Sequence, residues 1–120
     1  MKRDMDLMRE ILMEVERIPY DGGGHEVSIP ERSAEEIYYH VMLLNEAQLI
    51  EALDLSGDDY VLWRPTRLTN AGHEFLDAAR ADTMWAKAKD RAFKSTGTIT
   101  LEALKIALGA LIKQALMGGM

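Results

Sequence analysis

The chain has 120 residues, of which 48% are hydrophobic and 28% are charged, with no cysteine and three prolines. This length supports one hydrophobic core with an extension, and this composition is typical of a globular protein rather than a disordered or fibrous one. The missing cysteines exclude disulfides, thiolate catalysis and cysteine zinc sites. The N-terminus lacks the uninterrupted apolar stretch of a signal peptide, so we expect a cytoplasmic protein.

The net charge of −6 is distributed unevenly along the chain. Residues 1–30 carry 4 basic and 7 acidic groups, residues 31–69 carry 3 and 8, and residues 70–120 carry 7 and 5. The middle segment is therefore the most acidic, with a net charge of −5. A DNA-reading surface would be expected in this segment, and its charge disfavours contact with phosphates.

The first third of the chain predicts a helix, a loop and a short strand. Apolar residues recur at three- and four-residue spacing between Met5 and Ile18, which indicates an amphipathic helix with Asp4 or Asp6 as its N-cap. Pro19 and the glycines at 22–24 end this helix. Residues 25–29 alternate polar and apolar side chains before a proline, which predicts one short edge strand.

The middle of the chain predicts a helix followed by a β-hairpin. Ser33 is typical of a helix N-cap and two glutamates follow it, so we expect a second helix that ends near residue 47 or 48. Residues 49–55 alternate with a period of two, and residues 56–59 have the composition of a turn. Residues 60–65 are rich in aromatic and branched side chains, which favours a returning strand.

Three helices are expected in the remainder. The first runs from an N-cap at Thr69 to about Arg80, and the second begins at a cap formed by Asp82 or Thr83. The second carries a narrow apolar stripe, and the last helix, after Thr100, has a wide apolar face. Ile106 and Ile112 are expected to extend that wide face. The stripe consists of Trp85, Ala88 and Ala92, and a wider version of it includes Phe93. The wide face consists of Leu101, Leu104, Leu108, Leu111 and Ala115.

The last helix is expected to serve packing or association rather than membrane insertion. Lysines interrupt its apolar run, which falls short of the roughly 20 apolar residues that a membrane span needs. We expect it to dock on the same chain or to form a homodimer. The candidate association residues are Leu101, Leu104, Leu108 and Leu111.

The order helix, strand, helix, hairpin, helix is the outline of a winged helix. The segment 33–50 resembles the recognition helix and wing entry of many small regulators, where Gln48 stands at a position usually held by glycine. We therefore expect an α+β, mostly helical fold. It comprises a winged-helix-like domain over residues 1–80 and a C-terminal helical extension over residues 81–120, packed on that domain or on a second subunit.

Several short segments together resemble one family. They are residues 1–7, 39–40, 68–69, 72–77 and 82–85, and the last two are the most specific. The chain is similar over nearly its whole length to the bacterial and phage family called domain of unknown function 2513. This resemblance implies a winged-helix-like fold in phage or prophage genomes, and it implies no known activity.

DNA binding is the first function to weigh for such a fold. No scaffold helix is predicted before Ser33, and the helix that follows carries Glu35, Glu36 and Glu46 but no lysine or arginine. The hairpin tip is also acidic, at residues 58–59. A DNA-binding winged-helix transcriptional regulator is therefore the alternative function, with DNA disfavoured as a partner. Its candidate contact residues are Arg32, Arg64 and Arg67.

Catalytic and metal motifs are incomplete. His73 and Glu74 begin like a zinc-protease motif, but Asp77 stands where the second histidine is required. The glycines at 22–24 precede His25 without the lysine of a phosphate loop, which favours a plain connection. We expect His40 to be partly buried beside the core. No catalytic residue, cofactor or metal site is expected, and the chain is not expected to be an enzyme.

The remaining hypothesis is a protein-contact surface on the second helix. Tyr38 and Tyr39 cannot both face the core, so at least one is expected to be exposed among carboxylates. The candidate contact residues are Glu35, Tyr38, Tyr39, Met42 and Glu46. Trp63 and Trp85 are interpreted as packing anchors for the hairpin and the extension.

The function that we expect is a non-catalytic interaction or regulatory module of phage or prophage origin, with an unidentified protein partner. A second alternative is a phage counter-defence protein that presents an acidic surface in place of DNA.

Overall fold

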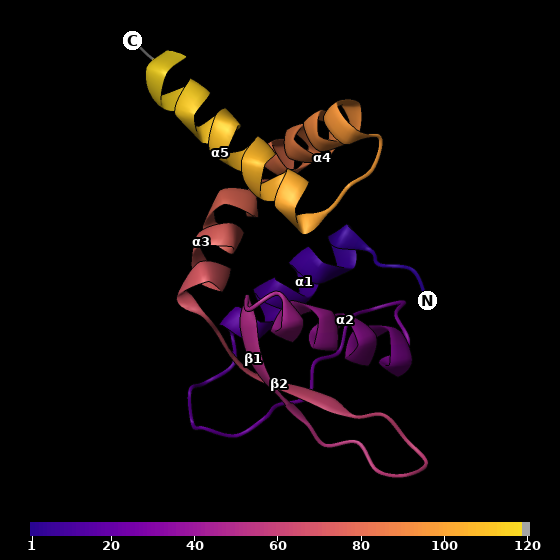
Figure 1. Ribbon diagram of the computed structural model, residues 1–120. Helices are drawn as coiled ribbons and strands as arrows, with labels where there is room; N and C mark the ends of the chain where they lie inside the picture. Colours follow the sequence, from indigo (N-terminus) through magenta and orange to yellow (C-terminus); the bar gives the residue numbers. More distant parts are fainter. Residues whose placement is uncertain (119–120) are drawn as a thin grey trace. The chain divides into compact units, whose positions relative to one another are not determined.

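The computed structural model describes residues 1–118, and its coarse class, α+β and mostly helical, is the predicted one. The described elements are α1 (Met5–Glu16), α2 (Ala34–Glu46), β1 (Ile50–Asp54), β2 (Trp63–Leu68), α3 (Asn70–Ala79), α4 (Asp82–Thr96) and α5 (Leu101–Gly118) (Figure 1). The chain forms two compact units, which divide between Glu74 and Phe75 inside α3. The winged-helix assignment and the domain boundary at residue 80 stay predictions.

Helix α1 supplies much of the core of the first unit. Asp4 is its N-cap, as one of the two expected candidates, and its carboxylate accepts a hydrogen bond of 3.1 Å from the backbone N–H of Leu7. The helix ends at Glu16, two residues before the expected end at Ile18, and Arg17 closes it. Its buried side consists of Met5, Leu7, Met8, Ile11, Leu12 and Val15.

The expected edge strand at residues 25–29 is wrong. The segment reaches β2, where the backbone N–H of His25 donates to the carbonyl of Pro65 at 3.0 Å, but none of residues 25–29 is in a strand. A strand pair needs a repeated exchange of backbone hydrogen bonds, and this single bond does not continue into one. Gly24 allows the approach, because a Cβ there would lie 2.5 Å from the Cβ of Arg64.

Helix α2 and the hairpin follow the predicted order. Ser33 and Glu36 form a capping box at the start of α2, and Gln48 turns the chain after it with a positive φ of 64°. Strands β1 and β2 pair antiparallel from Ile50↔Leu68 to Asp54↔Trp63, with an irregularity between Glu51 and Ala52. The predicted hairpin is confirmed, although the return strand begins at Trp63 and not at residue 60.

The start of α3 is fixed to the junction between α2 and β1. The backbone N–H of Thr69 donates to the carbonyl of Leu49, and the Thr69 hydroxyl donates to the carbonyl of Gln48 at 2.7 Å. The same hydroxyl accepts from the N–H of Gly72, which confirms Thr69 as the cap of this helix. Gly72 lies against the carbonyl of Leu49 so closely that a Cβ would overlap it.

In the second unit, α5 packs on α4. The expected side-chain cap of α4 at Asp82 or Thr83 is wrong. Ala81 is the N-cap with no side-chain hydrogen bond, because Asp82 is already the first helical residue. Trp85 is buried and meets the ring of Phe75 edge to face, with centroids 6.3 Å apart. The buried stripe of α4 consists of Trp85, Ala88 and Ala92, without Phe93, which is exposed.

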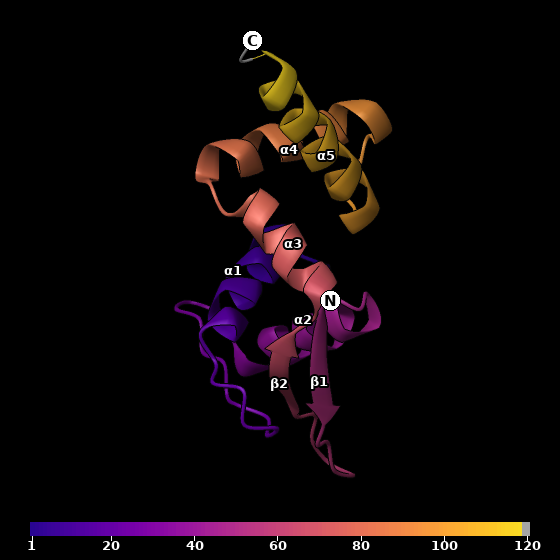
Figure 2. The ribbon, with the colours of Figure 1, turned by 90° about the vertical axis from the view of Figure 1, so that its left-hand side faces the viewer.

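The apolar face of α5 is narrower than expected. Only Leu104, Ala107 and Leu108 are buried, and all lie in the first half of the helix. Ile106 is 65% exposed and Ile112 is 38% exposed, so neither extends the packed face. The second half of α5 runs beyond α4 (Figures 1 and 2). None of the helices among residues 1–118 is long and apolar enough to cross a membrane.

Candidate interaction surface

The five candidate contact residues lie on one side of α2. The capping box fixes the helix start, and the spacing of three, four and seven residues then aligns Glu35, Tyr38, Tyr39, Met42 and Glu46. Glu35 and Glu46 are exposed, whereas the three larger side chains are half-buried. The opposite side of α2 carries the buried residues Ile37, His40, Val41 and Leu44. The helix therefore presents two half-buried tyrosines and a methionine between two carboxylates.

Neither glutamate of this face is neutralised by the protein. In the described part of the chain, Glu35 and Glu46 have no basic group within ion-pair distance. The face thus combines three half-buried side chains, Tyr38, Tyr39 and Met42, with two carboxylates that have no ion-pair partner among the described residues.

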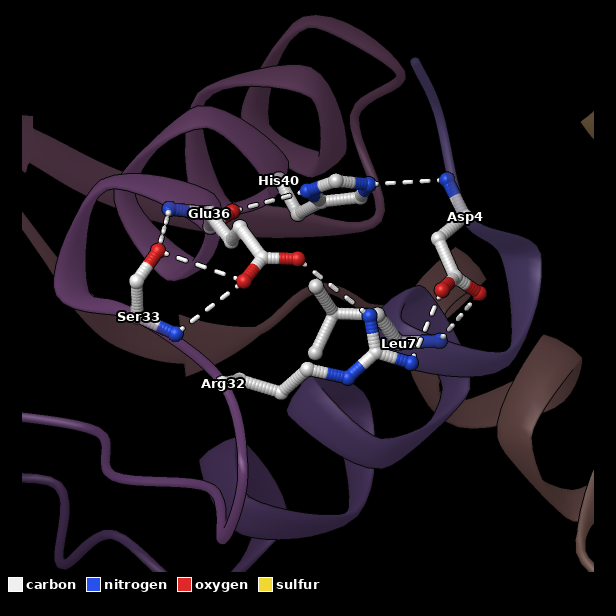
Figure 3. A network of polar contacts seen from close by, with 6 residues as sticks. All are labelled: Asp4, Leu7, Arg32, Ser33, Glu36 and His40. Atoms are coloured by element: carbon white, nitrogen blue, oxygen red, sulfur yellow. Dashed lines mark hydrogen bonds and ion pairs between the residues drawn. The ribbon is translucent and has the colours of Figure 1, made fainter. Parts of the chain in front are cut away.

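A polar network joins the start of α1 to α2 on the buried side (Figure 3). The backbone N–H of Asp4 donates to Nε2 of His40 at 2.8 Å, and Nδ1 of His40 lies 2.7 Å from the carbonyl of Glu36. Because Nε2 accepts a hydrogen bond, Nδ1 carries the proton and donates it to that carbonyl. His40 is 1% exposed, more buried than expected, and both ring nitrogens are satisfied.

Arg32 lies at the centre of the charged part of this network. Its guanidinium contacts the Asp4 carboxylate at 2.8 Å and the Glu36 carboxylate at 3.4 Å (Figure 3). Glu36 also accepts from the backbone N–H and the hydroxyl of Ser33, at 3.1 and 3.2 Å. The first turns of two helices are thereby held together by one arginine.

These contacts shift the acidities of the two carboxyls. Partial burial raises the pKa of Asp4, but the Leu7 N–H and the Arg32 guanidinium outweigh it, so the pKa lies below its ordinary value. The backbone N–H of Ser33, with Arg32, lowers the pKa of Glu36. The same two carboxylates raise the pKa of Arg32, with the larger effect from Asp4.

The three arginines considered for DNA contact are all paired with carboxylates. Arg32 belongs to the network above, and Arg64 lies 3.6 Å from the carboxylate of Glu26. Arg67 makes a bidentate contact with Glu51, its partner on β1: Nη2 donates to Oε1 at 2.8 Å and Nε donates to Oε2 at 3.2 Å. The positive charge of each arginine is thus balanced by a carboxylate of the same chain. In addition, no scaffold helix lies between α1 and α2.

The histidines are separated, and no group of three potential metal ligands occurs among residues 1–118. His25 pairs with Asp21 at 2.9 Å, and this hydrogen bond, with a second from the Gly23 N–H, lowers the pKa of the aspartate. His73 is exposed on α3. It lines an open pocket of about 530 Å³ together with the apolar residues Val15, Ile18 and Leu68.

The sequence did not reveal the link between Asp4 and His40, since 36 residues separate them and no local pattern connects them. It also gave no sign of the carboxylates that pair with the arginines, because Glu26 and Glu51 come from other segments. Of the candidate association residues, Leu104 and Leu108 are buried and Leu101 and Leu111 are half-buried. Trp63 is half-buried on the hairpin.

Comparison with known proteins identifies the family of this chain. The family described as "Hypothetical protein (DUF2513)" matches residues 2–98, which is most of the chain and stops before α5. A protein of Haemophilus influenzae described as "Uncharacterized protein" is 34% identical over an alignment that spans 97% of this chain and 99% of that relative. No solved structure matches. The match over residues 2–98 and this full-length relative show that the chain belongs to the DUF2513 family.

Proposed function

We propose that this protein is a non-catalytic interaction module that contacts a protein partner through the outer face of α2. The observation that carries the proposal is the charge arrangement around this helix. Glu35 and Glu46 have no basic partner in residues 1–118, whereas Arg32, Arg64 and Arg67 are each paired with a carboxylate. A regulatory role, a phage or prophage origin and a cytoplasmic location belong to the same proposal.

The composition of the face supports a protein partner. Tyrosine is enriched among residues that dominate binding energy, and methionine adapts to irregular apolar surfaces. Tyr38, Tyr39 and Met42 are half-buried, so their conformations are restricted before binding. A partner with basic groups at the rim of an apolar patch would match the two glutamates.

The test compares proteins captured from extracts of the source cells by three baits. One bait is the natural chain, one carries Glu35→Lys, Tyr38→Ala and Glu46→Lys, and a charge-matched control carries Glu10→Lys and Glu74→Lys. We expect a protein that the natural and control baits retain and the α2 variant loses, and that binds the purified natural chain directly. Identical captures by the first two baits would reject the α2 face.

The alternative function, a DNA-binding regulator, is tested by measuring the affinity of the chain for duplex DNA. Fluorescence anisotropy with labelled duplex DNA at physiological salt should give weak or no binding, because residues 31–69 carry a net charge of −5. Sub-micromolar affinity with a steep salt dependence, lost on replacing Arg32, Arg64 or Arg67, would favour the regulator.

A further inference from the structure

An alanine-lined groove runs between α4 and α5 in the second unit. Its volume is about 340 Å³, and its walls include Ala92, Ala103, Ala107 and Ala110, with the exposed Ile106 at one side. An apolar cavity of about 150 Å³ is already large enough to hold benzene. The groove therefore has room for a large apolar side chain.

Arg91 lines this groove and has no acidic partner among the described residues. It is exposed, and no carboxylate lies within ion-pair distance of its guanidinium in the described part of the chain. Two other basic residues of the second unit do have acidic partners, since Arg80 pairs with Asp77 and Lys94 pairs with Asp90. Residues 82–118 carry six basic and three acidic groups, so this part of the chain has a net positive charge.

The hairpin tip carries acidic and apolar side chains, which complement the arginine and the apolar lining of the groove. Tyr60 and Val61 are 60% and 58% exposed, and they follow Asp58 and Asp59, which have no basic partner in the described residues. The tip projects from the helices of the first unit (Figures 1 and 2). It thus offers large apolar side chains directly beside two free carboxylates.

Hydrogen bonds within the hairpin also order the tip. Leu55 donates its backbone N–H to the carbonyl of Leu62 at 2.8 Å, and Gly57 donates to the carbonyl of Tyr60 at 3.1 Å. The Tyr60 ring covers Gly57, where a Cβ would lie 2.5 Å from the ring. A segment that is ordered before binding loses less conformational entropy when it docks.

We propose that the hairpin tip of one copy, residues 55–61, docks into the α4–α5 groove of a second copy. The exposed side chains of Tyr60 and Val61 together enter the alanine-lined space, and Asp58 and Asp59 face Arg91. Charge complementarity selects this occupant, because the tip is acidic and apolar while the groove is basic at its rim and apolar inside. This contact does not involve the α2 face, so each proposal can fail without the other.

Charge reversal tests the contact by sedimentation of the full chain over a range of concentrations. Arg91→Asp alone, or Asp58→Arg with Asp59→Arg, places like charges together and should weaken self-association at least about tenfold. All three changes in one chain should restore it. Since none of these side chains has an internal partner, thermal melts should be unchanged.

Matched controls separate this contact from general charge effects. Lys113→Asp makes the same change in charge as Arg91→Asp and lies in the same unit, but outside the groove. It should leave association unchanged. Tyr60→Ser should weaken it, while Tyr20→Ser, at an exposed tyrosine outside the tip, should not. The proposal is overturned if the natural chain remains monomeric throughout, or if the triple variant associates no better than the single reversals.

Discussion

The backbone N–H of Asp4 donates a hydrogen bond to Nε2 of His40, which connects the first turn of α1 to the buried side of α2 over 36 residues. The bond defines the neutral tautomer of His40, because the ring must accept at Nε2 and donate at Nδ1. It also satisfies one of the backbone donors that a helix start leaves without an intrahelical partner. This buried imidazole is therefore a structural group that joins the start of α1 to the middle of α2.

Replacing His40 should destabilise the first unit. His40→Phe keeps a ring of similar shape but leaves the Asp4 N–H without its acceptor, at a cost of about 1–3 kcal/mol. Urea unfolding measures this loss, and hydrogen exchange at the Asp4 amide should accelerate. The matched control, His73→Phe at an exposed position, should stay within about 0.5 kcal/mol of the natural chain. Equal losses in the two variants would contradict the structural role of His40.

Stability should fall on acidification through Asp4 and Glu36. Both carboxyls have folded pKa values below their ordinary values of 3.8 and 4.5, so the unfolded chain binds their protons more readily. Their contribution is present above those ordinary values and is lost as the pH falls through the lower folded values. Urea unfolding at a series of pH values measures this dependence.

Arg32→Met identifies the source of this pH dependence. The variant should be less stable than the natural chain near neutral pH, and the difference should shrink in acid, where both carboxyls become protonated. Arg17→Met, which removes an exposed pair with Glu14, serves as the control and should show no such convergence. A constant difference between Arg32→Met and the natural chain at every pH would rule out this assignment.

Gln48→Gly should stabilise the protein. Gln48 has a positive φ of 64°, a conformation that costs a residue with a side chain roughly 1–2 kcal/mol and costs glycine little. We expect a gain of up to about 1 kcal/mol in thermal or urea unfolding, since glycine also adds entropy to the unfolded chain. Glu10→Gly, at an exposed position inside α1, should instead lose about 1 kcal/mol. A loss of stability in Gln48→Gly would show that the Gln48 side chain has a role of its own.

Gly72→Ala should be strongly destabilising for a different reason. A Cβ at this position would overlap the carbonyl of Leu49, which also accepts from Thr69, so the start of α3 would have to move away from the junction between α2 and β1. We expect a loss of at least about 1–3 kcal/mol. Gly109→Ala is the control, because its Cβ would meet open space in α5 and should add up to about 1 kcal/mol. The two substitutions should therefore have opposite signs.

Local signals predicted the elements well. The caps at Asp4, Ser33 and Thr69 depend on a side chain and a backbone N–H three residues away, so a short stretch of sequence contains both partners. The hairpin was predictable because two segments of period two flank a turn. The alignment of the candidate residues on α2 followed from helical periodicity alone.

Features that depend on distant partners were not predictable. Alternation over residues 25–29 fits a strand, but it cannot tell whether a neighbour is placed to form more than the single bond to Pro65. Ile106 and Ile112 fit the apolar pattern of α5, yet α4 offers only a narrow stripe and leaves them exposed. The pairing of Arg64 and Arg67 likewise depends on glutamates brought close by folding.

The last prediction concerns the two halves of α5. Leu104 and Leu108 are buried in its first half, and burial of such a side chain contributes about 1.5–3 kcal/mol. A chain that ends at Thr98 loses both and uncovers the face of α4, so it should melt at a lower temperature and aggregate more readily. It also lacks the α4–α5 groove.

A chain that ends at Leu111 supplies the matched control. It keeps the buried leucines and removes residues 112–120, of which the described residues 112–118 are all exposed. We expect it to retain the melting temperature of the full chain, while the chain that ends at Thr98 does not. Light scattering of the three chains, beside their thermal melts, reports association separately from stability. If the chain ending at Thr98 stays soluble, equally stable and unchanged in oligomeric state, α5 neither supports the second unit nor mediates association.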